Sequence, residues 1–239
     1  MEKIRYILFI FLCFINVSLV YAAECPKITE DSIVVYNAGD YDSVPYCENM
    51  VATCAGQNNL CTSGCYPLTI ASILATYGYD YEPEDISTYL CDKFPTNAQA
   101  REYQLVITPN EEFHNQFSMT IEKIGKKGDN VSTLLAQVDQ TLADNKILMA
   151  SVYGGAYSGS GGAHYVAIAM KENGQYYVIN TGRRDSSGFV SQDYLIQNVL
   201  SILNAGLYIV APTQCDLVAD SGTMVAVLVP TNMKITSLI

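Results

Sequence analysis

The chain has 239 residues, of which 49% are apolar and 15% are charged. This length suits one domain with a full hydrophobic core, or at most two small ones, and the composition excludes a largely disordered chain. With 13 basic and 24 acidic residues, the net charge is −11, which argues against nucleic acid or an anionic membrane as a partner.

The first 22 residues predict an export signal. Lys3 and Arg5 give a short basic start, and an apolar stretch follows over residues 6–19. Val20-Tyr21-Ala22 then supplies the small residues that precede a cleavage site. The alternative is a retained membrane anchor, because the stretch is close to the shortest that spans a bilayer. Cleavage would give a secreted or extracytoplasmic protein with no membrane contact and a net charge of −12, from 11 basic and 23 acidic residues.

Residues 23–56 are polar and rich in cysteine and turn formers, which predicts a disulfide-tied N-terminal segment and a candidate propeptide. The main domain is expected over 57–239. Seven cysteines remain after the predicted cut, namely Cys25, Cys47, Cys54, Cys61, Cys65, Cys91 and Cys215. An exported protein meets oxidising conditions, so disulfides are expected. Because seven is odd, at least one thiol is left over, as an intermolecular partner, a reactive group or an inert buried residue.

Apolar periodicity predicts four helices in the first part of the main domain. Pro67–Tyr77 is apolar nearly all round and is followed by Gly78, which predicts a buried helix with a proline in its first turn. A second helix is expected over Pro83–Cys91. Two amphipathic helices are expected over 117–127 and 130–145.

The second half of the chain changes to a strand pattern. Strands are expected over 146–153, 164–170, 175–180, 207–211 and 223–229, with one more helix over 191–205. Glu172-Asn173-Gly174 predicts a tight turn between two of the strands. Helices followed by an antiparallel sheet predict an α+β fold stabilised by disulfides.

Cys65 is the candidate nucleophile. It stands two residues before Pro67 and therefore at the start of the apolar helix. There the helix dipole and the free backbone N–H groups favour a thiolate. Cys61 lies about one turn earlier, in the loop, and is better suited to a structural disulfide. A zinc site that combines Cys54 with these two residues is disfavoured, because the spacing fits no usual ligand pattern.

A cysteine nucleophile also needs donors for the oxyanion that its attack creates. The backbone N–H of Cys65 can supply one donor, and a side-chain amide just upstream can supply another. Gln57, Asn58 and Asn59 all offer such an amide, and Gln57 has the longest reach.

The chain has only two histidines, so few residues can serve as the general base. His114 lies in the polar stretch NEEFHNQF and is expected to be a surface residue. His164 follows a glycine-rich loop over 154–162 and begins a strand, which fixes its backbone and leaves its ring reachable. The alternative for His164 is a structural histidine at a strand end, hydrogen-bonded to a neighbour.

Asn180 is the candidate residue for orienting the histidine. In a hairpin that turns at 172–174, residues near the open ends of the two strands are neighbours, so His164 and Asn180 are expected side by side. The amide oxygen of Asn180 can then accept a hydrogen bond from the imidazole and hold its tautomer. The alternatives are a turn asparagine without this role, and Asp185 as the orienting group.

Two blocks of sequence carry these residues and resemble a known family. QNNLCTSGCYPLTIASILATYGYD, residues 57–80, resembles the nucleophile helix of papain-like cysteine peptidases in the bacteriocin-leader-peptidase-like branch. The matching features are Gly64-Cys65, Pro67, the small and aliphatic helix, and Tyr77-Gly78. GGAHYVAIAMKENGQYYVIN, residues 161–180, resembles the second block of that branch, in which a histidine begins one strand and an Asp or Asn ends the next.

The resemblance implies a papain-like fold, with a buried nucleophile helix packed on the antiparallel sheet, and cleavage of a peptide bond through a thioester. It makes Cys65 the nucleophile, His164 the base and then the acid, and Asn180 the orienting residue. Gln57, eight residues ahead of Cys65, would be the oxyanion donor. A peptide or protein substrate is implied, without a cofactor or metal.

Two positions depart from the branch. Tyr66 stands where Gly or Glu is usual, and Asn180 is followed by Thr181-Gly182 where Asp is more often followed by Pro. The same residues can run other acyl transfers, so an amidase or a transglutaminase-type acyltransferase is an alternative, as is a secreted binding protein that is not an enzyme. Asn130-Val131-Ser132 is a glycosylation sequon in a eukaryotic host, or only a helix cap.

Overall fold

The computed structural model describes residues 27–46, 59–93, 111–158, 162–182 and 187–213. Its strands are β1 (Met119–Gly125), β2 (Ile147–Tyr153), β3 (Ala163–Glu172), β4 (Gln175–Ile179), β5 (Gly188–Val190) and β6 (Leu203–Pro212). They form one antiparallel sheet in the order β1-β6-β2-β3-β4-β5. The strand predicted over 223–229 lies outside the described residues.

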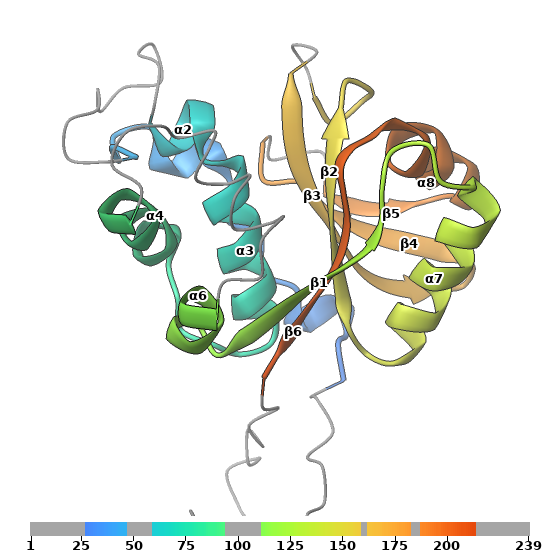
Figure 1. The fold of residues 1–239 in the computed structure, drawn as a ribbon, viewed down its shortest axis with the longest axis horizontal. Helices are drawn as coiled ribbons and strands as arrows, with labels where there is room; N and C mark the ends of the chain where they lie inside the picture. Colours follow the sequence, from blue (N-terminus) through green and yellow to red (C-terminus); the bar gives the residue numbers. More distant parts are fainter. Residues whose placement is uncertain (1–26, 47–58, 94–110, 159–161, 183–186, 214–239) are drawn as a thin grey trace, which may run out of the picture.

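The helices cover both faces of this sheet (Figure 1). They are α2 (Leu60–Ser63), α3 (Cys65–Thr76), α4 (Pro83–Lys93), α6 (Glu111–Gln116), α7 (Val131–Ala143) and α8 (Gln192–Asn198), with the short 3-10 turns η1 (Glu30–Ser32), η2 (Ala38–Tyr41) and η4 (Leu200–Ile202). The helices α2, α3, α4 and α6 lie on one side, and α7 and α8 lie on the other. The predicted combination of helices with an antiparallel sheet is confirmed.

Helix α3 is central to the first side of the sheet. Ten of its twelve residues are buried, which agrees with the prediction of a helix without a polar face. It packs against β3 and against α4, so the helix is enclosed by the sheet and by a second layer of helices. Most of the buried apolar residues of α3 belong to the larger of the two hydrophobic clusters. Burial of apolar surface stabilises the folded state by about 25 cal/mol per Å².

The hairpin of β3 and β4 turns as predicted. Glu172 pairs with Gln175, and the two turn residues have positive φ angles, 49° at Asn173 and 77° at Gly174. An Asn-Gly pair adopts this left-handed conformation with little strain, and such turns match the twist of the flanking strands.

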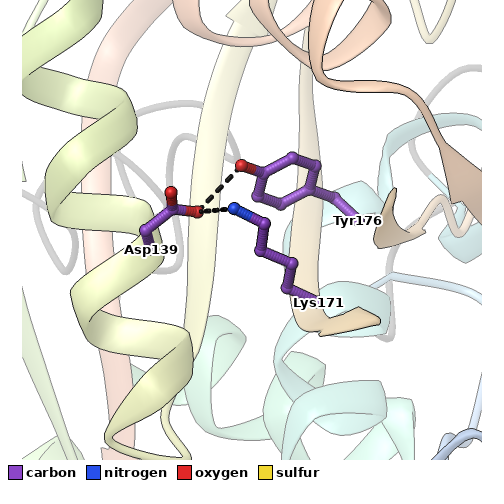
Figure 2. Close-up of polar contacts among 3 residues, drawn as sticks. All are labelled: Asp139, Lys171 and Tyr176. Carbon is purple, nitrogen blue, oxygen red and sulfur yellow. Dashed lines mark hydrogen bonds and ion pairs between the residues drawn. The ribbon is translucent and has the colours of Figure 1, made fainter. Parts of the chain in front are cut away.

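Helix α7 is tied to the same hairpin by a small polar cluster (Figure 2). The carboxylate of Asp139 accepts hydrogen bonds from Lys171 Nζ and from the hydroxyl of Tyr176, both at 2.8 Å. The Lys171 ammonium also lies 4.7 Å from the centre of the Tyr176 ring. These contacts fix the turn end of the hairpin against α7, on the face of the sheet opposite α3.

The helix predicted over 117–127 is wrong. The chain leaves α6 at Gln116, and Ser118 has a positive φ angle of 49°, which ends the helix. Met119–Gly125 then pairs with β6 as the edge strand β1. Pairing with a strand more than 80 residues away along the chain decided the conformation here, and a local pattern carries no information about it.

The helix predicted over 191–205 is shorter than expected. It covers only Gln192–Asn198, and the chain then passes through η4 into β6 at Leu203. The apolar residues after α8 belong to a buried strand, and the periodicity of such a short run cannot separate a strand from a helix. The predicted helices over 130–145 and 83–91 are confirmed as α7 and α4.

The described part of the N-terminal segment, residues 27–46, lies against the main domain. Ile28, Ala38 and Tyr46 are buried there. The backbone N–H groups of Val34 and Tyr36 donate to hydroxyl groups of α3. The removal of residues 23–56 as a propeptide stays a prediction. Across the described ranges, no helix is both long enough and apolar enough to cross a bilayer.

Candidate active site

Cys65 is the first residue of α3, two residues earlier than the predicted start of that helix. Gly64 separates α2 from α3, and a Cβ atom at this position would lie 2.3 Å from the carbonyl oxygen of Leu60. Glycine is therefore required for the close turn that places the cysteine at a helix N-terminus. Cys65 is half-buried and carries a thiol that is not part of a disulfide. Its position at the helix N-terminus favours the thiolate form.

Cys61 and Cys91 are each disulfide-bonded. The cysteines that can pair with them, Cys25, Cys47, Cys54 and Cys215, lie outside the described residues, so the connectivity and the predicted stabilisation by disulfides stay predictions. Cys61, predicted to be structural, is therefore bonded, whereas the sulfur of Cys65 is not in a disulfide.

His164 and Asn180 are neighbours, as the hairpin predicted. The distance from His164 Nε2 to Asn180 Oδ1 is 2.7 Å. The backbone N–H of Gly182 donates to the same Oδ1 atom at 3.1 Å, which identifies the atom facing the ring as the amide oxygen. Nε2 therefore donates its proton, and the lone pair of the neutral ring lies on Nδ1. This is the tautomer that a general base needs.

Burial lowers the pKa of His164, and the hydrogen bond to Asn180 opposes this effect only in part. A buried imidazolium loses solvation, and a neutral amide at Asn180 cannot compensate as a carboxylate would. The neutral ring, which can accept a proton, therefore persists to a lower pH than in an ordinary histidine.

Gly182 lies directly against the imidazole. A Cβ atom built on this residue would be 3.0 Å from His164 Cε1 and 3.4 Å from Asn180 Oδ1. The absence of a side chain therefore lets the turn after β4 close over the ring and brings the Gly182 N–H to the asparagine.

Contacts between α3 and β3 bring the segment of Cys65 to the segment of His164 (Figure 1). Tyr66 follows the cysteine and Tyr165 follows the histidine, and their rings meet edge to face with 5.2 Å between centres. One turn further along α3, Thr69 Oγ1 donates to the carbonyl oxygen of Tyr165 at 3.3 Å. The start of α3 therefore lies beside the start of β3.

The predicted oxyanion donor, Gln57, lies outside the described residues, and so do Asn58 and Asp185. The third upstream amide, Asn59, is fully buried and is the N-cap of α2. Its Oδ1 atom accepts from the backbone N–H of Thr62 at 2.8 Å and from the Thr62 hydroxyl at 2.9 Å. In the described structure its Nδ2 atom has no hydrogen-bond partner. A buried amide donor without an acceptor is costly, and a catalytic role is one explanation for it.

The second histidine, His114, lies in α6 and is half-buried, so it is less exposed than the surface residue that was expected. The amphipathic helix α6 turns one side towards the core, which a polar stretch of sequence does not reveal. Within the described ranges, no group of three or more His, Cys, Asp or Glu side chains is placed to hold a metal ion.

Sequence reasoning missed two buried threonines, Thr69 and Thr181. Thr69 is one polar residue inside an apolar helix, and Thr181 was noted only as a departure from a family pattern. Their hydroxyl groups lie 3.4 Å apart, although the residues are 112 positions apart in the chain. No signal in a single sequence indicates such a pair.

No protein-family model matches the chain, and no curated protein matches it. Several solved structures are similar to part of the chain. The peptidase domain of Streptococcus ComA, a bi-functional ABC transporter involved in a quorum-sensing pathway, has a TM-score of 0.40 and 18% identity, over 63% of this chain and 92% of that chain. A C39-like peptidase from Bacillus anthracis has a TM-score of 0.40 and 8% identity, over 64% of this chain and 90% of that chain.

The Pseudomonas avirulence protein AvrPphB has a TM-score of 0.31 and 10% identity, over 62% of this chain and 91% of that chain. Structural similarity at TM-scores of 0.40 and below assigns neither a fold family nor a chemical activity to this chain. The function proposed for this chain therefore rests on the geometry of its own residues.

Proposed function

We propose that this protein is an exported cysteine peptidase of papain-like architecture, with Cys65, His164 and Asn180 as its catalytic triad. The observation that carries the proposal is the 2.7 Å contact between His164 Nε2 and Asn180 Oδ1, on a strand packed against the helix that begins with Cys65. A base of fixed tautomer near a thiol at a helix N-terminus is the arrangement that nucleophilic catalysis by cysteine needs.

The proposed reaction has two halves. In the first, the Cys65 sulfur attacks the peptide carbonyl carbon while its proton passes to His164 Nδ1, and a tetrahedral oxyanion forms. When the C–N bond breaks, the imidazolium gives that proton to the departing amine, and the acyl group stays on sulfur as a thioester. In the second half, His164 takes a proton from water, the hydroxide attacks the thioester, and the proton returns to the sulfur as the acid leaves.

The oxyanion requires two hydrogen-bond donors. The backbone N–H of Cys65, at the first position of α3, serves as one. Gln57 is the predicted second donor, and Asn59 competes with it because its buried Nδ2 atom has no acceptor. Removing such a donor typically costs about 3 kcal/mol of transition-state stabilisation.

The substrate class follows from charge and site chemistry. The predicted mature chain carries a net charge of −12, so neutral or cationic peptides approach it more readily than acidic ones. The site chemistry requires no cofactor. Export through the signal over residues 1–22 places the reaction outside the cytoplasm, where Cys61 and Cys91 are expected to stay oxidised.

Digestion of a peptide library by the purified mature protein tests the proposal. Cys65→Ala and His164→Ala are each expected to lower kcat about 10⁶-fold, because the nucleophile or its base is lost, while Tm stays close to that of the native protein. Asn180→Ala is expected to retain part of the activity, since the ring loses its orientation but not its basicity.

Two outcomes contradict the proposal. If the native protein cleaves no peptide but incorporates an added amine into a glutamine substrate, the triad serves acyl transfer and not hydrolysis. If neither reaction occurs, and Cys65→Ala binds the same peptides as the native protein, the chain is a binding protein.

A further inference from the structure

Thr181 connects the proposed catalytic residues to two other parts of the chain. It lies between Asn180 and Gly182 and is fully buried. Its carbonyl oxygen accepts from the backbone N–H of Ala38, in the N-terminal segment, at 2.7 Å. Its hydroxyl lies 3.4 Å from the hydroxyl of Thr69 on α3. A single residue thus contacts both the N-terminal segment and the nucleophile helix.

The direction of the hydroxyl contacts can be assigned. A threonine hydroxyl has one hydrogen to donate. Thr69 donates its hydrogen to the carbonyl oxygen of Tyr165 at 3.3 Å, so Thr181 must be the donor in the contact between the two threonines. The chain of donors runs from Thr181 to Thr69 and then to Tyr165.

Each residue in this chain of donors is close to one member of the proposed triad. Thr181 follows Asn180, Tyr165 follows His164, and Thr69 lies one helical turn after Cys65 on α3. The three segments that must hold a fixed relative position for catalysis are therefore joined by hydroxyl contacts inside the core. Both oxygen–oxygen distances are longer than the usual 2.7–2.8 Å, so each contact adds little stability by itself.

We propose that Thr181 is a positioning residue, which sets Asn180 and His164 relative to Cys65 through its contacts with Thr69 and Ala38. The inference rests on the proposed function. Its physical basis is the steep dependence of catalysis on geometry, since a displacement of about 1 Å at a reacting group can lower the rate about 100-fold.

The test compares Thr181→Val with Thr181→Ser. Valine keeps the shape and removes the hydroxyl, whereas serine restores it. Thr141→Val is the matched control, because Thr141 is also a buried threonine but lies on α7, on the other side of the sheet. Each variant is measured for kcat and KM on a cleaved peptide, for the rate at which iodoacetamide labels Cys65, and for Tm.

Thr181→Val is expected to lower kcat about tenfold with little change in KM, and to slow the labelling of Cys65. Thr181→Ser is expected to regain most of both rates, and Thr141→Val to leave both unchanged. Thr69→Val combined with Thr181→Val should cost less than the sum of the single effects, because both variants break the same contact.

The positioning role is overturned if Thr181→Val lowers Tm but keeps the native kcat and labelling rate, which is the result for a purely structural threonine. It is also overturned if Thr181→Ser is as slow as Thr181→Val. Failure of the proposed function gives a different result, namely a native protein that cleaves no peptide and whose Cys65 reacts no faster than an ordinary thiol.

Discussion

The side chain at position 180 decides how the histidine behaves. A carboxylate there would favour the imidazolium and raise the pKa of His164, but the amide of Asn180 carries no charge. Burial therefore prevails, and the pKa of His164 is lowered. Because the Gly182 N–H also holds Asn180 Oδ1, the amide fixes the tautomer without charging the ring. The residue that resembled a departure from the family pattern thus suits a neutral base.

At the residue scale, the identity of the second oxyanion donor can be tested. Asn59→Ser keeps an oxygen to cap α2 and removes the amide nitrogen. If Asn59 is the donor, this variant is expected to lower kcat by 10²- to 10³-fold. The control is Asn130→Ser, because Asn130 caps α7 in the same way, with its Oδ1 accepting from the backbone of Thr133 at 3.1 Å.

Gln57→Ala is measured alongside. Loss of activity in Gln57→Ala with full activity in Asn59→Ser would assign the role to Gln57. A similar small loss in Asn59→Ser and Asn130→Ser would mean that only the helix caps were disturbed.

The placement of the candidate site residues could be predicted from sequence because it depends on local patterns. An apolar run that begins just after Cys65 predicts a helix N-terminus, and an Asn-Gly turn predicts that His164 and Asn180 meet. The contact between Thr69 and Thr181 could not be predicted. Their contact joins a helix to a distant strand end, and one polar residue in an apolar run has many structural explanations.

At the scale of elements, the N-terminal segment is held to α3 by hydrogen bonds from its backbone to side chains of the helix. Val34 N–H donates to Thr76 Oγ1 at 3.1 Å and Tyr36 N–H donates to Ser72 Oγ at 3.0 Å. These donors alternate along the extended segment, and the acceptors are four residues apart, so they share one face of the helix. The two hydroxyls therefore provide acceptors for two part-buried backbone donors.

This arrangement predicts that Ser72→Ala lowers the free energy of unfolding by about 1–3 kcal/mol, because the Tyr36 N–H loses its acceptor. Urea denaturation measures the change. Ser132→Ala on the exposed face of α7 is the control for helix propensity. Equal stability of the two variants would show that the hydrogen bond to Ser72 does not hold the segment in place.

The errors of prediction at this scale share one cause. The helix expected over 117–127 is the strand β1, and the helix expected over 191–205 gives way to β6. These two strands pair with each other. Apolar residues in both segments fit more than one periodicity, and the choice was made by long-range pairing.

At the scale of the whole molecule, the antiparallel sheet separates two hydrophobic clusters, and the candidate site forms where the first cluster meets the sheet. Helix α3 carries the proposed nucleophile, and the hairpin of β3 and β4 carries the proposed base and orienting residue. The helix and the hairpin are regular elements that pack against each other, which limits how far the proposed catalytic groups can move apart. Rigid elements hold reacting groups more accurately than loops do.

The rate of labelling of Cys65 by iodoacetamide, measured as a function of pH and located by mass spectrometry under native, non-reducing conditions, tests the central claim most directly. An ordinary thiol with a pKa near 8.5 loses reactivity about tenfold per pH unit below that value. At the start of α3 the helix N-terminus favours the thiolate, and the proton that the thiol gives to His164 leaves a positive ring that stabilises it, so the thiolate of Cys65 is expected to persist below a pH of about 8.5. Labelling of Cys65 is therefore expected to stay fast there in the native protein, and to follow the ordinary thiol profile in His164→Ala. An ordinary profile in the native protein, unchanged by His164→Ala, would contradict the account.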